Sequence, residues 1–105
     1  MAVVRFSLMR PIVGQRAAVE RLVEELNQFV SKQPGFIMAC RFRGRDDEEI
    51  GRLAVYETAE RADEIALMDH TQAVRSQLHE LIQAGHTEEL FIVRGSPIGL
   101  LKAKG

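Results

Sequence analysis

The 105-residue chain has one cysteine, no tryptophan and no excess of either charge. Because Cys40 has no second thiol to pair with, an intrachain disulfide and a cysteine-based zinc cluster are both excluded. Lysine and arginine number 14 against 15 acidic residues, and this net charge of −1 argues against a nucleic-acid or anionic-membrane partner. No apolar run approaches the roughly 20 residues that a membrane span requires. We therefore expect no nucleic-acid partner and no membrane partner.

The amino end has no charged lead followed by an apolar run, so we expect no signal peptide and a cytoplasmic protein. The length gives room for one domain with one core. A chain this short buries only roughly 60 to 70 percent of its extended surface, so a partner subunit would add stability. We predict a single domain over residues 1–95 and a carboxyl-terminal tail, residues 96–105, that packs on the partner subunit.

Alternating and amphipathic segments follow one another along the chain. Alternation of apolar and polar residues predicts four strands, at residues 2–9, 36–43, 50–57 and 88–94. Apolar residues spaced by three and four predict a helix over residues 15–32 and a second helical region over residues 59–84. This order is the split β-α-β pattern. It predicts an α+β, ferredoxin-like β-α-β-β-α-β fold with a four-stranded antiparallel sheet.

Side chains alternate across a strand, so the predicted strands sort into two faces. One face is wholly apolar, and we expect the helices to cover it: Val4, Phe6, Leu8, Phe36, Met38, Cys40, Phe42, Leu53, Val55, Phe91 and Val93. The other face mixes apolar side chains with arginines, among them Arg5, Arg41 and Arg52. A second sheet packed on this mixed face would explain its composition, so we predict a homodimer through it.

His70 is the strongest candidate for chemistry. It continues a row of residues four apart, after Ala62 and Ala66 and before Val74 and Leu78, which predicts a side chain that points toward the sheet. An inward imidazole can act as a base or a hydrogen-bond donor. The alternative is a core histidine satisfied by a backbone carbonyl, where the helical region is expected to kink.

Asp69 or Thr71 is expected to cap a new helical turn at this kink. Around His70 we expect a pocket lined by Met38, Phe42, Met68 and Phe91. If these four side chains fill the space instead, no cavity remains and a non-catalytic role is favoured.

The chain lacks the sequence motifs of several other kinds of chemistry. No glycine-rich nucleotide motif follows a predicted strand, and no nucleophile elbow is present. The remaining histidines, His79 and His86, show no spacing with carboxylates that is typical of a metal site. His79 is expected to be solvated, and His86 is assigned no role. We therefore predict no metal and no cofactor.

These features resemble the antibiotic biosynthesis monooxygenase family of the dimeric α/β-barrel superfamily. The resemblance covers residues 3–95 and rests on the strand order, on the Gln-Pro-Gly-Phe segment at 33–36 and on the Ala-Leu-Met-Asp-His segment at 66–70 followed by residues 73–81. It implies a homodimer whose two sheets face one another inside a barrel, with a pocket in each subunit between helices and sheet. Among the family's functional positions, only His70 has a counterpart here.

The resemblance also implies a function, a cofactor-independent monooxygenase that acts on a small quinol- or anthrone-like aromatic, with His70 as the base. The first alternative is a non-catalytic dimer that binds a small hydrophobic ligand or serves under stress. The second is haem binding or degradation. Haem degraders of the family typically add a tryptophan and an asparagine, whereas this chain has no tryptophan and its asparagine, Asn27, belongs to the first predicted helix.

Overall fold

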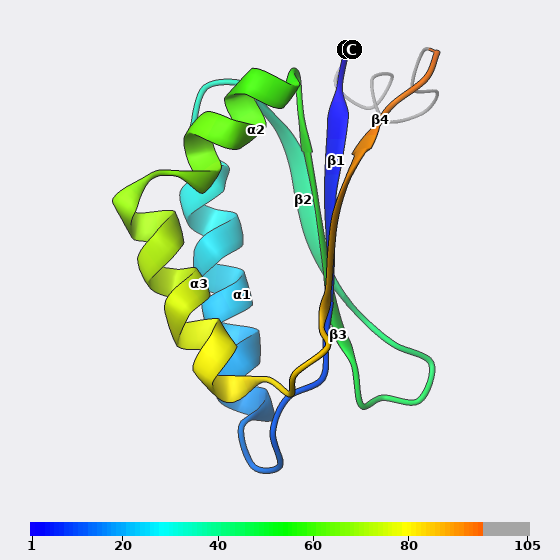
Figure 1. Ribbon diagram of the computed structural model, residues 1–105, viewed down its shortest axis with the longest axis vertical. Helices are drawn as coiled ribbons and strands as arrows, with labels where there is room; N and C mark the ends of the chain where they lie inside the picture. The colour runs from blue at the N-terminus through cyan, green and yellow to red at the C-terminus, as the bar shows by residue number, and fades with distance from the viewer. Residues whose placement is uncertain (96–105) are drawn as a thin grey trace.

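The computed structural model describes residues 1–95, which form one four-stranded antiparallel sheet with helices on one side (Figure 1). The strands are β1 (Val3–Met9), β2 (Phe36–Arg43), β3 (Ile50–Tyr56) and β4 (Thr87–Ile92). The helices are α1 (Arg16–Val30), α2 (Ala59–Ala66) and α3 (Asp69–Leu81). The strand order β2-β3-β1-β4 confirms the predicted α+β, ferredoxin-like fold. The predicted tail, residues 96–105, lies outside the described residues.

The second helical region divides into α2 and α3, as the interrupted apolar pattern predicts. The cap differs from the prediction, because α3 begins after Met68, which makes no side-chain capping bond. Asp69 lies in the first turn of α3, where a negative charge is favoured by the helix dipole. Thr71 points inward and is buried. Within residues 1–95 no helix has the length and apolarity needed to cross a membrane.

The strand register shows which side chains share a face of the sheet. Val3, Arg5 and Met9 of β1 stand opposite Tyr56, Ala54 and Ile50 of β3, and these positions lie under the helices. The core packs the buried members of this set against apolar side chains of the helices: Val19, Val23, Leu26, Val30, Ala62, Ile65, Val74 and Leu78. The helices therefore cover the mixed face.

This arrangement overturns the predicted roles of the two faces. The wholly apolar set was expected beneath the helices, and the mixed set was expected in a dimer interface. The division itself is correct for most positions, but the two faces exchange places. Phe36 is an exception, because a β-bulge between Phe36 and Met38 shifts the register of β2. Phe36 consequently packs on the core side beside Tyr56, whereas Met38 lies on the opposite side of the sheet.

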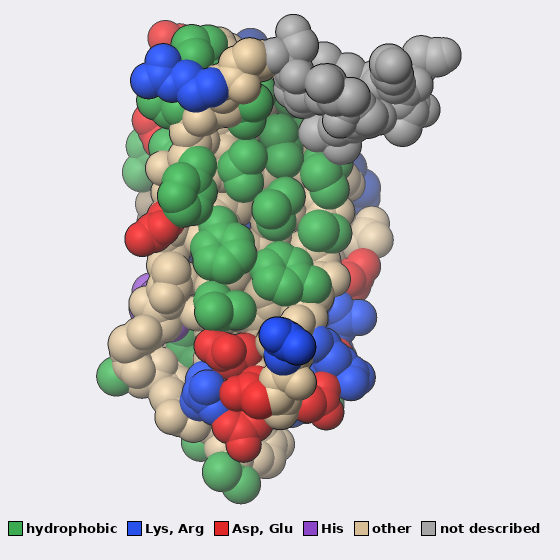
Figure 2. Space-filling model, turned by 90° about the vertical axis from the view of Figure 1, so that its right-hand side faces the viewer, with side chains coloured by type: hydrophobic (Ala, Val, Ile, Leu, Met, Phe, Trp, Pro, Cys, Tyr) green, Lys and Arg blue, Asp and Glu red, His purple; other side chains and the backbone are tan. Residues whose placement is uncertain are grey.

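The opposite side of the sheet, which we call the outer sheet face, carries an apolar surface: Val4, Phe6, Leu8, Met38, Cys40, Phe42, Leu53, Val55 and Phe91. Figure 2 shows hydrophobic side chains gathered over this side, with charged groups near one end. Phe6 and Phe42 stack with ring centroids 6.0 Å apart. The ring of Phe42 lies over Gly51, where a Cβ atom would have no room. No described helix covers this face.

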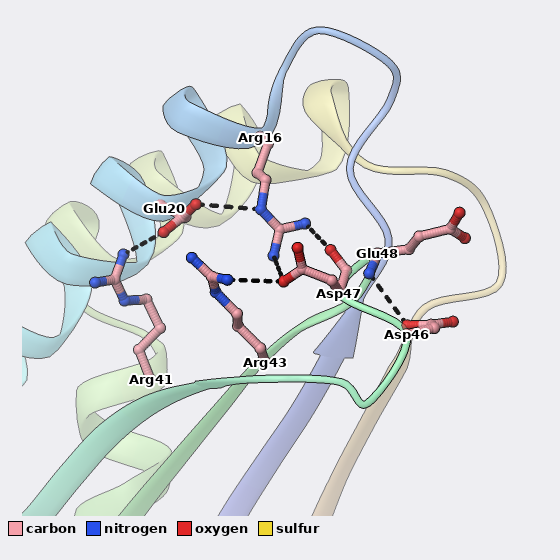
Figure 3. A network of polar contacts seen from close by, with 7 residues as sticks. All are labelled: Arg16, Glu20, Arg41, Arg43, Asp46, Asp47 and Glu48. Atoms are coloured by element: carbon pink, nitrogen blue, oxygen red, sulfur yellow. Dashed lines mark hydrogen bonds and ion pairs between the residues drawn. The ribbon is translucent and has the colours of Figure 1, made fainter.

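A network of ion pairs ties the β2–β3 hairpin to α1 (Figure 3). Glu20 accepts from Arg41 at 2.9 Å and lies 3.3 Å from Arg16, while Asp47 accepts from Arg43 at 2.8 Å. Arg41 and Arg43 of β2 are therefore each paired with a carboxylate. All of these groups are at least partly exposed, so we expect the network to contribute only modestly to the stability of the fold.

Candidate ligand-binding cavity

A cavity of about 40 Å³ lies between the helices and the sheet. Apolar side chains form much of its wall: Met9, Leu26, Val30, Ala62, Ile65, Leu78 and Ile82. Helix-facing positions of β1 and β3 supply polar groups at its floor, among them Arg5 and Arg52. We call this space the helix–sheet cavity. The cavity has a polar floor because the helices cover the mixed face of the sheet. Arginines that would suit a solvated sheet therefore face the protein interior.

Arg52 is the unusual residue of this cavity. It is 4% exposed, and its Nε donates a hydrogen bond of 2.6 Å to Oδ1 of Asn27 on α1. Its Nη2 is buried and has no hydrogen-bond partner. Among residues 1–95 no carboxylate lies within ion-pair distance of it. Burial lowers the pKa of the Arg52 guanidinium, an effect that the neighbouring Tyr56 partly offsets, but an arginine remains charged at any physiological pH.

An uncompensated buried charge is expensive. The penalty for removing an ion from water is several kcal/mol even after relaxation, and a buried donor without a partner costs about 1–3 kcal/mol. Thr71 adds a second unsatisfied group, since its Oγ1 is buried without a partner and the residue also lines the cavity. Two unsatisfied polar groups at one largely apolar cavity are explained if water or a small ligand occupies it.

The exposed end of the cavity carries charged groups and both remaining histidines. Glu88 of β4 forms ion pairs with Arg75 of α3 and with Arg5, whose Nη1 lies 3.8 Å away. His79 and His86 also line the cavity, and their ring centroids are 4.9 Å apart. From the sequence, His79 was expected to be solvated and His86 was assigned no role. Only the fold brings them together.

His70 lies elsewhere. Its side chain is 44% exposed, its Nε2 is 3.3 Å from Oε2 of Glu25, and its ring packs on Phe29 with centroids 4.4 Å apart. The residue is absent from the lining of the helix–sheet cavity. The prediction that His70 points toward the sheet is wrong, because the break after α2 rotates α3 and leaves Thr71, Val74 and Leu78 as its buried row. Its catalytic role stays a prediction.

Three of the four residues expected to line a pocket at His70 lie on the other side of the sheet. Met38, Phe42 and Phe91 lie on the outer sheet face, separated from the helices by the sheet itself. Met68 lies on the helical side, where it packs against the core. None of the four lines the helix–sheet cavity. For Met38, Phe42 and Phe91 the error follows from exchanging the two faces, since these three were assigned to the apolar face that the helices were expected to cover.

The fold and cavity place this chain in a known structural class, the ferredoxin-like proteins with helices over one face of the sheet. Searches against protein-family models and curated proteins found no match. Solved structures do match. Rv0793 from Mycobacterium tuberculosis aligns with a TM-score of 0.85 and 17% identity, covering 91% of this chain and 98% of that one.

Two further structures carry names that refer to an activity. SnoaB, a cofactor-independent oxygenase from Streptomyces nogalater, aligns with a TM-score of 0.75 and 22% identity, covering 91% of this chain and 97% of its own. A candidate antibiotic biosynthesis monooxygenase from Chloroflexus aurantiacus aligns with a TM-score of 0.71 and 22% identity, covering 94% of this chain and 100% of that one. At these identities, the likeness shows a shared fold.

Proposed function

We propose that the chain is a cofactor-independent monooxygenase whose substrate is a small aromatic, quinol- or anthrone-like compound bound in the helix–sheet cavity. The observation that carries the proposal is the unpartnered guanidinium nitrogen of Arg52 in an apolar cavity. A flat ring suits the apolar wall, and an ionised phenol or enol oxygen suits the guanidinium. The shared fold with SnoaB, named as a cofactor-independent oxygenase, supports the same class of reaction.

The chemistry requires the anion of the substrate. A charge-assisted hydrogen bond from Arg52 stabilises the ionised oxygen and so lowers the pKa of the bound substrate. The anion passes one electron to O2, and the resulting substrate radical and superoxide combine into a peroxide. Loss of water from the peroxide leaves a new carbonyl group. For an anthrone the balance is substrate and O2 in, quinone and water out, with the removed proton recovered in the water.

The size of the cavity sets a condition on binding. A space of about 40 Å³ holds a few water molecules and no aromatic ring. A ring can enter if side chains at the exposed end move, and His79 and Arg75 have the surface exposure that such movement needs. The same small volume favours the second candidate function, a non-catalytic protein that binds a smaller acidic ligand. Oxygen uptake with an anthrone or quinol distinguishes the two candidates.

The first prediction concerns the acidic oxygen. Under anaerobic conditions, 1,4-dihydroxynaphthalene is expected to bind about 10- to 100-fold more tightly than its dimethyl ether, because hydrogen bonds to a charged group contribute about 1.5–3 kcal/mol. Calorimetry or fluorescence titration measures both affinities. The Arg52→Met variant is the control for the added bulk of the ether. A preference that survives in this variant is steric and contradicts the proposed role of Arg52.

The second prediction concerns His70. We expect His70→Ala to bind the quinol and to consume oxygen at the rate of the unaltered protein, since the imidazole lies outside the helix–sheet cavity. Its contact with Glu25 is exposed, so the stability of the variant should change by less than about 1 kcal/mol. Oxygen-electrode rates and thermal unfolding are the two measurements. A large loss of rate in a folded His70→Ala protein would restore the base predicted from the sequence.

We also infer that the protein is a homodimer that pairs through the outer sheet face. Monomeric proteins rarely leave a contiguous apolar surface of this kind in contact with water. Two such sheets can pack face to face about 10 Å apart, which buries the apolar side chains of both subunits. The predicted dimer is thereby retained, but its interface moves from the mixed face to the apolar one. The helix–sheet cavity lies on the other side of each sheet and stays accessible.

A further inference from the structure

We propose that His79, His86 and Glu88 form a binding site for a divalent transition-metal ion at the exposed end of the helix–sheet cavity. Each residue offers one ligand atom, and the three atoms lie within 4.8 Å of one another. The Nε2 atom of His86 is 3.9 Å from Oε2 of Glu88. Two imidazoles and one carboxylate are a donor set that suits zinc, iron and other first-row divalent ions, with coordination positions left open.

The surroundings of Glu88 hold its carboxylate in a defined orientation. Its Oε1 atom faces the guanidinium groups of Arg75 and Arg5, while Oε2 is the oxygen directed to His86. Each oxygen therefore has a separate role, one fixed by arginine and the other available to an ion. Outer hydrogen-bond partners of this kind orient metal-binding side chains in known sites. The two arginines also oppose a cation, although Arg5 lies 3.8 Å from a second carboxylate, that of Asp63.

The other ligands come from elements that can adjust. His79 lies in the last turn of α3, where the helix dipole favours a positive charge. The side chain of His86 is 28% exposed. Ligands about 2.1 Å from one ion lie roughly 3.0–3.5 Å from each other, so the three side chains need to approach by about 1–2 Å. Rotation of exposed side chains supplies a movement of this size.

The position of the site gives it a consequence for ligand binding. His79, His86 and Glu88 all line the helix–sheet cavity that also contains Arg52. An ion held here would direct its open coordination positions to the same cavity and add positive charge at its exposed end. The metal site is nevertheless independent of the proposed oxygenase activity and can be tested without any substrate.

The test is calorimetric titration of the untagged, chelator-treated full chain with Zn²⁺, and of the same protein with Co²⁺ followed by visible absorption. A Cys40→Ser background removes the exposed thiol, which could bind metal on the outer sheet face. One ion per chain is expected. Because loss of an outer partner alone costs about 10- to 100-fold in affinity, His79→Ala and His86→Ala should each weaken binding by at least about tenfold.

His70→Ala is the matched control, because it removes an exposed histidine that also lies beside a glutamate. It should leave the affinity unchanged. Zn²⁺ should raise the thermal midpoint of the unaltered chain but not that of His86→Ala. If the Glu88→Gln variant unfolds because it loses its ion pairs, the metal affinities of His79→Ala and His86→Ala decide whether the site exists. Absence of one-to-one binding, full affinity in His86→Ala, or an equal loss in His70→Ala would each overturn the site.

Discussion

Replacing Arg52 by methionine is expected to weaken quinol binding by about 10- to 100-fold and to abolish oxygen uptake, while leaving the protein equally stable or more stable. The loss of affinity follows from removing a charged hydrogen-bond donor that is buried at the cavity. The stability follows from removing a buried cation that has no carboxylate partner among residues 1–95, because the desolvation cost disappears with the charge. Binding is therefore weakened without any loss of stability. Titration and denaturant unfolding measure the two effects.

Arg41→Met provides the matched control. Arg41 stands directly opposite Arg52 in the β2–β3 register, but its side chain is 38% exposed and pairs with Glu20. This variant should change neither quinol affinity nor stability by more than about 1 kcal/mol. An Asn27→Asp variant should also weaken quinol binding, because a carboxylate at this position would neutralise Arg52. If Arg52→Met keeps its affinity, or if it loses stability together with affinity, Arg52 is a structural residue and the proposed anion site is wrong.

Phe6→Asp is expected to convert the proposed dimer into a folded monomer. Phe6 lies on the outer sheet face of a central strand, stacked with Phe42. A two-fold interface would bury the new carboxylate twice, once from each subunit. Each buried ion costs several kcal/mol, and each 1.4 kcal/mol is tenfold in affinity, so the dissociation constant should rise at least about a thousandfold. Light scattering coupled to size-exclusion chromatography measures the mass.

Leu67→Asp is the matched control, because it also introduces a carboxylate but at a position away from the proposed dimer interface. Leu67 is 70% exposed between α2 and α3, on the helical side of the sheet. We expect this variant to stay dimeric and Phe6→Asp to retain native circular dichroism as a monomer. A monomeric unaltered protein, or a Phe6→Asp protein that remains dimeric, would refute pairing through the outer sheet face. Neither result would affect the Arg52 experiment, because the cavity lies on the opposite side of the sheet.

Local sequence determined the elements and their order. The period of two in the strands, the apolar stripe of α1 and the interruption before His70 depend on neighbouring residues only, so they can be read without the fold. The same period also divided most strand positions correctly into an apolar and a mixed set. Phe36 was assigned to the wrong set, because a β-bulge depends on pairing with the neighbouring strand.

Only the tertiary structure decided which set the helices cover. Alternation fixes which side chains share a face, but the pairing register and the path of the helices decide which face becomes interior. That decision moved Arg52 from the expected dimer interface into a buried cavity, and Met38, Phe42 and Phe91 out to the other side of the sheet. The break before α3 likewise turned His70 outward, and the return of the chain to β4 placed His86 beside His79. The candidate site therefore arises from contacts between residues far apart in sequence, which no local pattern records.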